Sequence, residues 1–176
     1  MNEKAKKLSK KNIIVDGHID LPFRLYKENL LEEENINLNK NTSGNFDTYK
    51  AKKGGLNCPF MAIYTPSEKS ENESYTFANS LIDLVYNVIK SNKEFDYAFT
   101  PKDVIKNFKK NKISLPMGME NGSPIGKDIN RIKYFFDRGI RYMTLTHAAD
   151  NQICDSSYDS RNCLLYTSDA ADDETS

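Results

Sequence analysis

The chain has 176 residues, which is enough for one domain with a hydrophobic core of its own. Its 25 Lys and Arg residues balance its 25 Asp and Glu residues, so the net charge indicates neither nucleic acid nor a membrane surface as a partner. Three cysteines (Cys58, Cys154 and Cys163) without a Cys-x-x-Cys pair argue against a disulfide scaffold and favour a reduced, cytoplasmic protein.

The start of the chain is rich in lysine, and we expect residues 1–10 to form a disordered basic terminus. The apolar run that follows, residues 13–15, is too short for a signal peptide or a membrane span. The folded domain is expected to begin near residue 11.

The apolar run at 13–15 predicts a buried first strand, which ends before Pro22. His18 and Asp20 lie two residues apart, so in extended chain their side chains point to the same side. An imidazole and a carboxylate on one side form a plausible half of a divalent metal site. Alone, the pair is also consistent with a hydrogen-bonded histidine and an aspartate that caps the next helix.

Helices and strands alternate along the rest of the chain. The sequence Thr100-Pro101-Lys102-Asp103 is typical of a capped helix start. Residues 32–44 are polar and aperiodic, which predicts a long loop. The other expected elements are helices at 21–26, 47–53, 74–90 and 127–138, and strands at 60–64, 113–119 and 142–146.

The two later helices are expected to bury their apolar residues against the sheet. These residues are Val104, Ile105 and Phe108 in the helix that begins near residue 100, and Ile129, Ile132, Phe135 and Phe136 in the helix at 127–138.

Four strands that alternate with helices predict a parallel sheet in an α/β fold. In such folds, functional side chains gather at the carboxyl ends of the strands. Glu120 follows the third expected strand and His147 follows the fourth, which places both near His18 and Asp20. Each is also consistent with a simpler role, Glu120 as an exposed turn carboxylate and His147 as a capping or core histidine.

These segments together resemble the membrane (renal-type) dipeptidases, a family of amidohydrolase-like metallopeptidases. The resemblance is carried by an ordered set of segments with similar separations rather than by any single one. They are VDGHIDLP at 15–22, GGL at 54–56, IYTP at 63–66, GMENG at 118–122 and GIRYMTLTH at 139–147.

The resemblance implies an N-terminal half, about four βα units, of a TIM (β/α)₈ barrel with two zinc ions at its carboxyl mouth. It implies that His18 and Asp20 bind one ion and that Glu120 bridges both. His147 is implied to contact the dipeptide substrate and to steady the oxyanion. The implied reaction is hydrolysis of a dipeptide by a metal-bridging hydroxide. Assembly of the full-length protein into a homo-oligomer is left open.

The chain also departs from the family. The second zinc needs two further histidines, and no histidine follows His147. A full barrel takes about 250 residues. Residues 164–176 contain no Lys, Asn or Ile, unlike the sequence before them. We interpret residues 11–162 as a partial dipeptidase barrel and 163–176 as a non-native tail on a truncated, inactive fragment; a native acidic tail is the alternative.

Two other functions are consistent with the sequence. One is a different amidohydrolase-like barrel that hydrolyses another amide or an ester. The other is a non-catalytic α/β binding domain, in which His18 and Asp20 are only structural.

Overall fold

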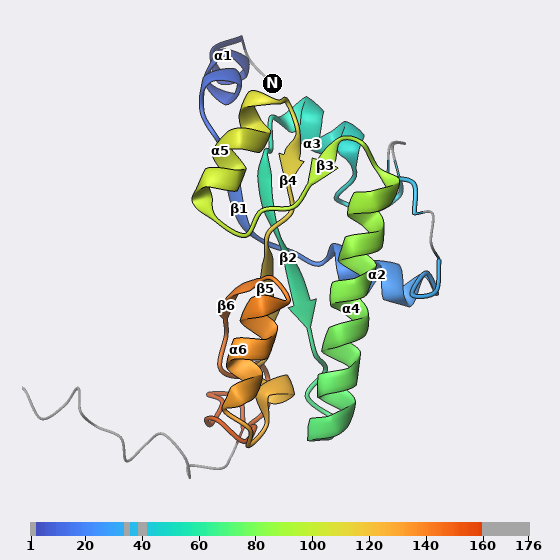
Figure 1. Ribbon diagram of the computed structural model, residues 1–176, viewed down its shortest axis with the longest axis vertical. Coiled ribbons are helices and arrows are strands. Elements are labelled where there is room, and N and C mark those ends of the chain that lie inside the picture. Colours follow the sequence, from blue (N-terminus) through green and yellow to red (C-terminus); the bar gives the residue numbers. More distant parts are fainter. Residues whose placement is uncertain (1–2, 34–35, 39–41, 160–176) are drawn as a thin grey trace, which may run out of the picture.

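The computed structural model describes residues 3–33, 36–38 and 42–159, and four of its strands form one parallel sheet (Figure 1). The spatial order of the strands equals their order in the sequence, as in a (β/α)₈ barrel, of which they represent four units. The strands are β1 (Val15–Ile19), β2 (Cys58–Tyr64), β5 (Met117–Glu120) and β6 (Ile140–Met143). A separate parallel pair consists of β3 (Phe95–Asp96) and β4 (Ile113–Ser114).

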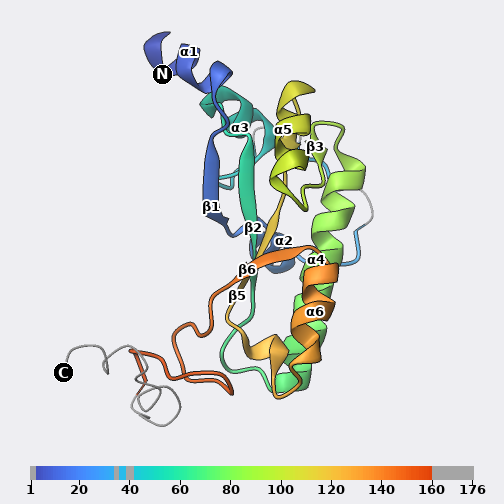
Figure 2. The ribbon, with the colours of Figure 1, turned by 60° about the vertical axis from the view of Figure 1, so that its left-hand side comes forward.

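The helices α4 and α6 lie on the same side of the sheet, and no helix of the described residues covers the opposite side, which is called the open side below (Figure 2). This arrangement follows from the right-handed crossovers typical of parallel strands, because strands added in one direction then place their connecting helices on one side of the sheet. The helices are α1 (Glu3–Lys11), α2 (Leu21–Lys27), α3 (Thr48–Gly54), α4 (Glu71–Ser91), α5 (Pro101–Lys109) and α6 (Asn130–Asp137), with a 3₁₀ turn η1 (Ser123–Ile125).

Local signals in the sequence set several helix ends. The predicted cap at Thr100 is confirmed, since its hydroxyl accepts from the Asp103 amide and the Asp103 carboxylate accepts from the Thr100 amide. Ser70 and Glu73 form the same reciprocal arrangement at the start of α4. Gly55, in the left-handed conformation at φ 78°, ends α3, because glycine adopts this conformation without steric cost.

The core lies between the sheet and α4. Met61 and Ile63 of β2 and Met119 of β5 are fully buried against Leu81 and other apolar residues of α4. Full burial of such a side chain contributes about 1.5–3 kcal/mol. The strands and the longest helix therefore form a stable platform for the residues at the strand ends.

On the open side of the sheet, Tyr142 of β6 lies flat across β5. Its ring occupies the space above Gly118, where an added Cβ would come within 2.1 Å of ring atoms. Its hydroxyl donates to the Gly17 carbonyl of β1 at 2.6 Å, and its ring packs on Phe60 at 5.3 Å between centroids. Glycine at 118 thus allows one phenol to connect the two edge strands.

Three expectations about elements are wrong. Residues 3–11 form the helix α1 instead of a disordered terminus, because Ser9 is buried against Gly55. The strand expected at 113–119 is divided between β4 and β5, with Pro116 in the gap. The first strand begins at Val15, which is 56% exposed because β1 lies at the edge of the sheet.

The burial expected for α5 and α6 is also largely wrong. In α5, Ile105 is 46% exposed, and Val104 and Phe108 are only half-buried. The buried residue is Asn107, whose side chain donates to the Tyr97 carbonyl and the Ser114 hydroxyl. In α6 only Phe135 is buried. The other three apolar residues face outward, since within the described part of the chain no element packs beyond α6; they are Ile129, Ile132 and Phe136.

Cys58 and Cys154 are buried free thiols, and burial raises the pKa of Cys58 to about 11. Cys163 and the tail expected at 163–176 lie outside the described residues, as does part of the loop expected at 32–44. Among the helices that the structure describes, none combines the length and apolarity needed to span a bilayer.

Candidate metal centre at the carboxyl end of the sheet

Three predicted site residues converge at the carboxyl ends of β1 and β5. The His18 Nε2 atom lies 3.3 Å from Asp20 Oδ1 and 3.2 Å from Glu120 Oε2. One potential ligand atom from each residue lies within 4.8 Å of the other two. These separations are small enough for the three side chains to share one ion.

The backbone of β1 directs the first two of these side chains. The register between β1 and β2 shifts between Asp16 and Ile19, and such irregularities change the direction of nearby side chains. The Asp16 carboxylate accepts from the His18 amide at 3.0 Å, which holds the strand end in this shape. Asp20 then occupies the N-cap position of α2, without making a side-chain cap hydrogen bond.

Glu120 is held by a network around the residue that follows it. Asn121 is 1% exposed and adopts a left-handed conformation with φ 74°, which Asn tolerates better than most residues. Its side chain donates to the Thr65 carbonyl at 2.8 Å and accepts from the Ser123 hydroxyl at 2.8 Å. Its amide donates to Thr144 Oγ1 at 3.0 Å. The turn therefore fixes the direction in which Glu120 leaves β5.

His147 lies on the other side of Glu120. Its Nε2 atom is 3.4 Å from Glu120 Oε1, whereas His18 approaches the other carboxylate oxygen. The ring packs edge-on against Tyr64, with centroids 5.1 Å apart. The Ser156 hydroxyl donates to the His147 carbonyl at 2.8 Å and anchors the loop. One glutamate thus stands between the only two histidines of the chain.

Two tyrosines border the cluster. Burial raises the pKa of Tyr64, and the carboxylates of Glu68, Glu120 and Asp20 raise it further. Burial and nearby carboxylates, that of Glu120 first, likewise raise the pKa of Tyr142. Both phenols therefore stay protonated at neutral pH and can serve as hydrogen-bond donors.

The donor set suits a divalent metal ion. A neutral imidazole and two carboxylates match the ligand preferences of zinc, and three protein ligands leave one position for water or substrate. His18 and His147 keep about two fifths of their side-chain surface exposed, at 41% and 40%, so the cluster is accessible from solvent.

The family model described as "Membrane dipeptidase (Peptidase family M19)" matches residues 2–169. The chain belongs to the membrane dipeptidase family. Among curated membrane dipeptidase relatives, it is 29% identical over 158 residues to Dipeptidase ataJ of Aspergillus terreus, covering 83% of this chain and 38% of the relative. It is 26% identical over 146 residues to Dipeptidase 3 of Mus musculus, covering 83% and 29%.

A solved structure has the same fold. It is a metallo peptidase from Rhodobacter sphaeroides, liganded with a phosphinate mimic of the dipeptide L-Ala-D-Ala. The TM-score is 0.68 at 21% identity, and the match covers 79% of this chain and 46% of that one. This membrane dipeptidase chain therefore spans less than half the length of each of these three proteins.

The four residues that the sequence proposed for a site lie together in the structure, but the sequence analysis did not point to the residues that hold them. Tyr64 belongs to a segment that carries the family resemblance, yet its contact with His147 has no local signature. Asn121 had one signal, because Asn-Gly after a strand is a common turn sequence. Tyr142 could not be found from sequence, since its role depends on the glycine of a neighbouring strand.

Proposed function

We propose that the protein containing this chain is a zinc-dependent dipeptidase. The main support is the convergence of His18, Asp20 and Glu120 within 4.8 Å, at the sheet edge where a (β/α)₈ barrel carries its active site. Family membership supports a metallopeptidase reaction on dipeptides.

The proposal assigns His18 and Asp20 to one zinc ion and Glu120 to a position between two ions. The assignment of Glu120 is supported by its two carboxylate oxygens, which face different histidines. Zinc bound there supplies a water of lowered pKa and polarises the scissile carbonyl. Asn121 and its hydrogen bonds hold the backbone turn from which the Glu120 side chain projects, and a site held in this way needs less reorganisation during a reaction.

His147 is proposed to bind the substrate and to donate a hydrogen bond where negative charge develops on the carbonyl oxygen. Its partial exposure supports contact with a substrate, and the Tyr64 ring limits how far the imidazole can turn. A preorganised donor of this kind typically accounts for a factor of about 10²–10³ in kcat.

The 176-residue chain alone is proposed to be inactive. It contains two histidines, His18 and His147, and the centre proposed here needs further ligands for its second ion. A cytoplasmic location also stays a proposal, since it depends only on the cysteine content.

The test uses the intact gene, sequenced past codon 162 from independent DNA, and its full-length product. We expect this protein to hydrolyse dipeptides and to carry close to two zinc ions when purified without chelator. Glu120→Gln should abolish turnover. The matched control is Glu28→Gln, at an exposed glutamate that pairs with Arg24, and it should leave turnover unchanged.

Other outcomes favour other functions. Turnover of different amides or esters, with dipeptides untouched, would indicate another amidohydrolase-like enzyme. No bound metal and no effect of Glu120→Gln on any activity would indicate a binding domain.

A further inference from the structure

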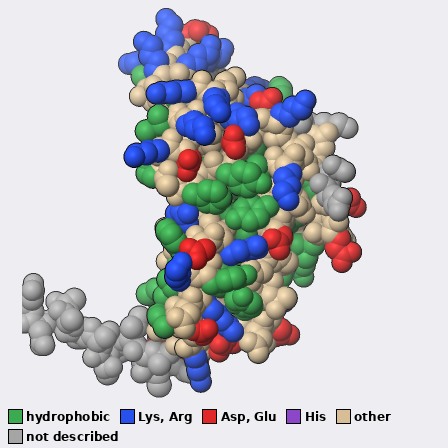
Figure 3. Space-filling view, viewed as in Figure 1, with side chains coloured by type: hydrophobic (Ala, Val, Ile, Leu, Met, Phe, Trp, Pro, Cys, Tyr) green, Lys and Arg blue, Asp and Glu red, His purple; other side chains and the backbone are tan. Residues whose placement is uncertain are grey.

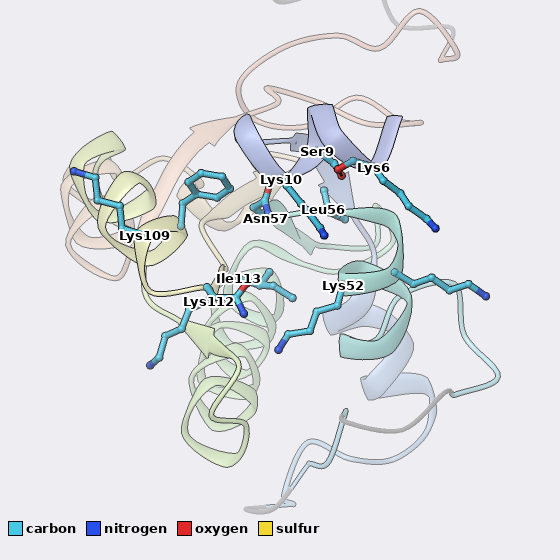
Figure 4. A pocket seen from close by; sticks show the side chains of 13 residues that line it. Lys6, Ser9, Lys10, Lys52, Leu56, Asn57, Lys109, Lys112 and Ile113 are labelled. Carbon is cyan, nitrogen blue, oxygen red and sulfur yellow. Dashed lines mark hydrogen bonds between the residues drawn. The ribbon is translucent and has the colours of Figure 1, made fainter. Parts of the chain in front are cut away.

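A cavity of about 720 Å³ lies at the end of the sheet opposite to the metal centre. It opens between α1, the end of α3 and the segment that joins α5 to β4 (Figure 4). Every ionisable residue in its lining is a lysine, and within the described residues no Asp or Glu lines it. The lysines are Lys6, Lys10, Lys52, Lys53, Lys109 and Lys112.

The fold itself builds this cavity. Ser9 of α1 packs into the space that Gly55 leaves by having no side chain, where an added Cβ would lie 2.5 Å from the Ser9 Cβ. The Asn57 carboxamide oxygen accepts from the Ile14 amide at 2.8 Å and ties β1 to the loop before β2. These contacts bring together lysines as far apart in the sequence as Lys6 and Lys112.

The charge of the cavity is only partly compensated. Lys6 pairs with Glu3, Lys52 with Glu94 and Lys112 with Asp96, and none of these carboxylates lines the cavity. The Lys112–Asp96 pair is half-buried, whereas the other two pairs are exposed and therefore weak. Figure 3 shows Lys and Arg side chains gathered at this end of the molecule, although the net charge of the chain is zero.

The shape and chemistry of the cavity define its ligand class. Figure 4 shows Lys10 and Lys52 directed into the space, whereas the side chains of Lys6, Lys109 and Lys112 start at its walls and extend away from it. The volume lies within the range of about 300–1,000 Å³ that is usual for small-molecule sites. Lysine binds phosphate as a mobile point charge. Like charges around one hollow repel one another, and a multivalent anion relieves that repulsion.

We propose that this cavity is a binding site for a small oligophosphate ligand. The site is independent of the metal centre. A concave cavity favours a compact anion over a nucleic acid duplex, which needs a longer basic surface. The apolar side chains of Leu56, Phe108 and Ile113 also line the space and give a nucleoside triphosphate an additional contact surface.

The test is calorimetric titration of the 176-residue chain, in metal-free buffer, with inorganic tripolyphosphate and separately with a nucleoside triphosphate. We expect one ligand per chain, with affinity that falls as salt is added. Lys10→Gln/Lys52→Gln should weaken binding about tenfold or more. Lys10→Arg/Lys52→Arg should retain it. The matched control Lys27→Gln/Lys127→Gln, on exposed lysines away from the cavity, should bind as the unaltered chain does.

The two ligands distinguish the source of the phosphates. Tighter binding of the nucleoside triphosphate would support a nucleotide in contact with the apolar wall, and equal binding would support a free oligophosphate. The proposal would be overturned if the cavity variant and the control variant lost affinity equally. Tighter binding of duplex DNA than of tripolyphosphate would also overturn it. Because all four substituted lysines are exposed, the variants should fold, which circular dichroism can check.

Discussion

The two ends of the same parallel sheet differ in charge and in how their side chains are held. At the carboxyl end, His18, Asp20 and Glu120 form a compact cluster supported by the buried Asn121 network. At the amino end, lysines from α1, α3 and the α5–β4 segment surround a cavity and are largely exposed. The fold thus separates the charges of a neutral chain, and a buried side-chain network stands directly behind the acidic cluster at the carboxyl end.

The largest effect on stability is expected from the turn that supports Glu120. Asn121→Ala removes the acceptor of Ser123 and the donor to Thr65, and places alanine at a positive φ. We expect a loss of about 3 kcal/mol in the free energy of unfolding, measured by urea titration. The control Asn130→Ala, which removes a hydrogen bond to Asp128 at the exposed start of α6, should change it by less than about 0.5 kcal/mol. Similar losses in both variants would show that the buried Asn121 network gives the turn no special support.

The next largest effect on stability is expected from Asp47, a buried carboxylate near the amino end of the sheet. Burial raises the pKa of Asp47, but hydrogen bonds from Lys50 and Thr42 more than offset this and lower it to about 2. Its contribution to stability is therefore complete above the ordinary pKa of 3.8 and is lost as the pH falls toward 2.

Asp47→Ala should accordingly cost about 2 kcal/mol at pH 7 and much less at pH 2. Urea titrations at both pH values measure this difference. A cost that does not depend on pH would show that packing, and not the ionised carboxylate, stabilises the start of α3.

A smaller effect is expected from the phenol that connects the edge strands. Tyr142→Phe removes the hydrogen bond to Gly17 and should cost about 1 kcal/mol. Because the pKa of Tyr142 is raised above its ordinary 10.0, its contribution is present below pH 10 and is lost as the pH rises further. Between neutral pH and pH 11, the free energy of unfolding should therefore fall less for Tyr142→Phe than for the unaltered chain. An equal fall in both would contradict a stabilising role of the Tyr142 hydroxyl.

The smallest effect on stability is expected on the exposed face of α6. Ile132→Ser should change the free energy of unfolding by about 0.5 kcal/mol or less, since Ile132 is 44% exposed. The 176-residue chain should nevertheless self-associate through this apolar face and the open strand edges, and the variant should do so less. Sedimentation velocity on the unaltered chain and on the variant measures the self-association of each. A chain that stays monomeric at the concentrations measured would contradict the expectation.

Much of the carboxyl end could be predicted from sequence because its residues lie at or near the ends of strands: His18 and Glu120 at the ends of β1 and β5, and Asp20 just after β1. His147 is less tightly placed, because the strand expected at 142–146 is found at Ile140–Met143. His18, Asp20 and Glu120 are within one or two residues of an element with a clear apolar pattern, and parallel strands bring such positions together. The alternation of strands and helices likewise predicted the four-stranded parallel sheet.

The amino end could not be predicted in the same way. Its lysines lie on helix surfaces, where a charged residue is usually solvated, and the sequence does not show which surfaces enclose a cavity. The exposure of Ile129 and Phe136 was missed for a related reason: periodicity identifies an apolar face but not whether an element packs on it.

The most direct test of the metal centre is anomalous diffraction at the zinc edge from crystals of the zinc-loaded protein. The arrangement of the carboxyl end predicts a peak about 2.0–2.2 Å from the His18 Nε2 atom and from carboxylate oxygens of Asp20 and Glu120. Zinc bound only elsewhere, with these three side chains free of metal, would contradict the proposed centre.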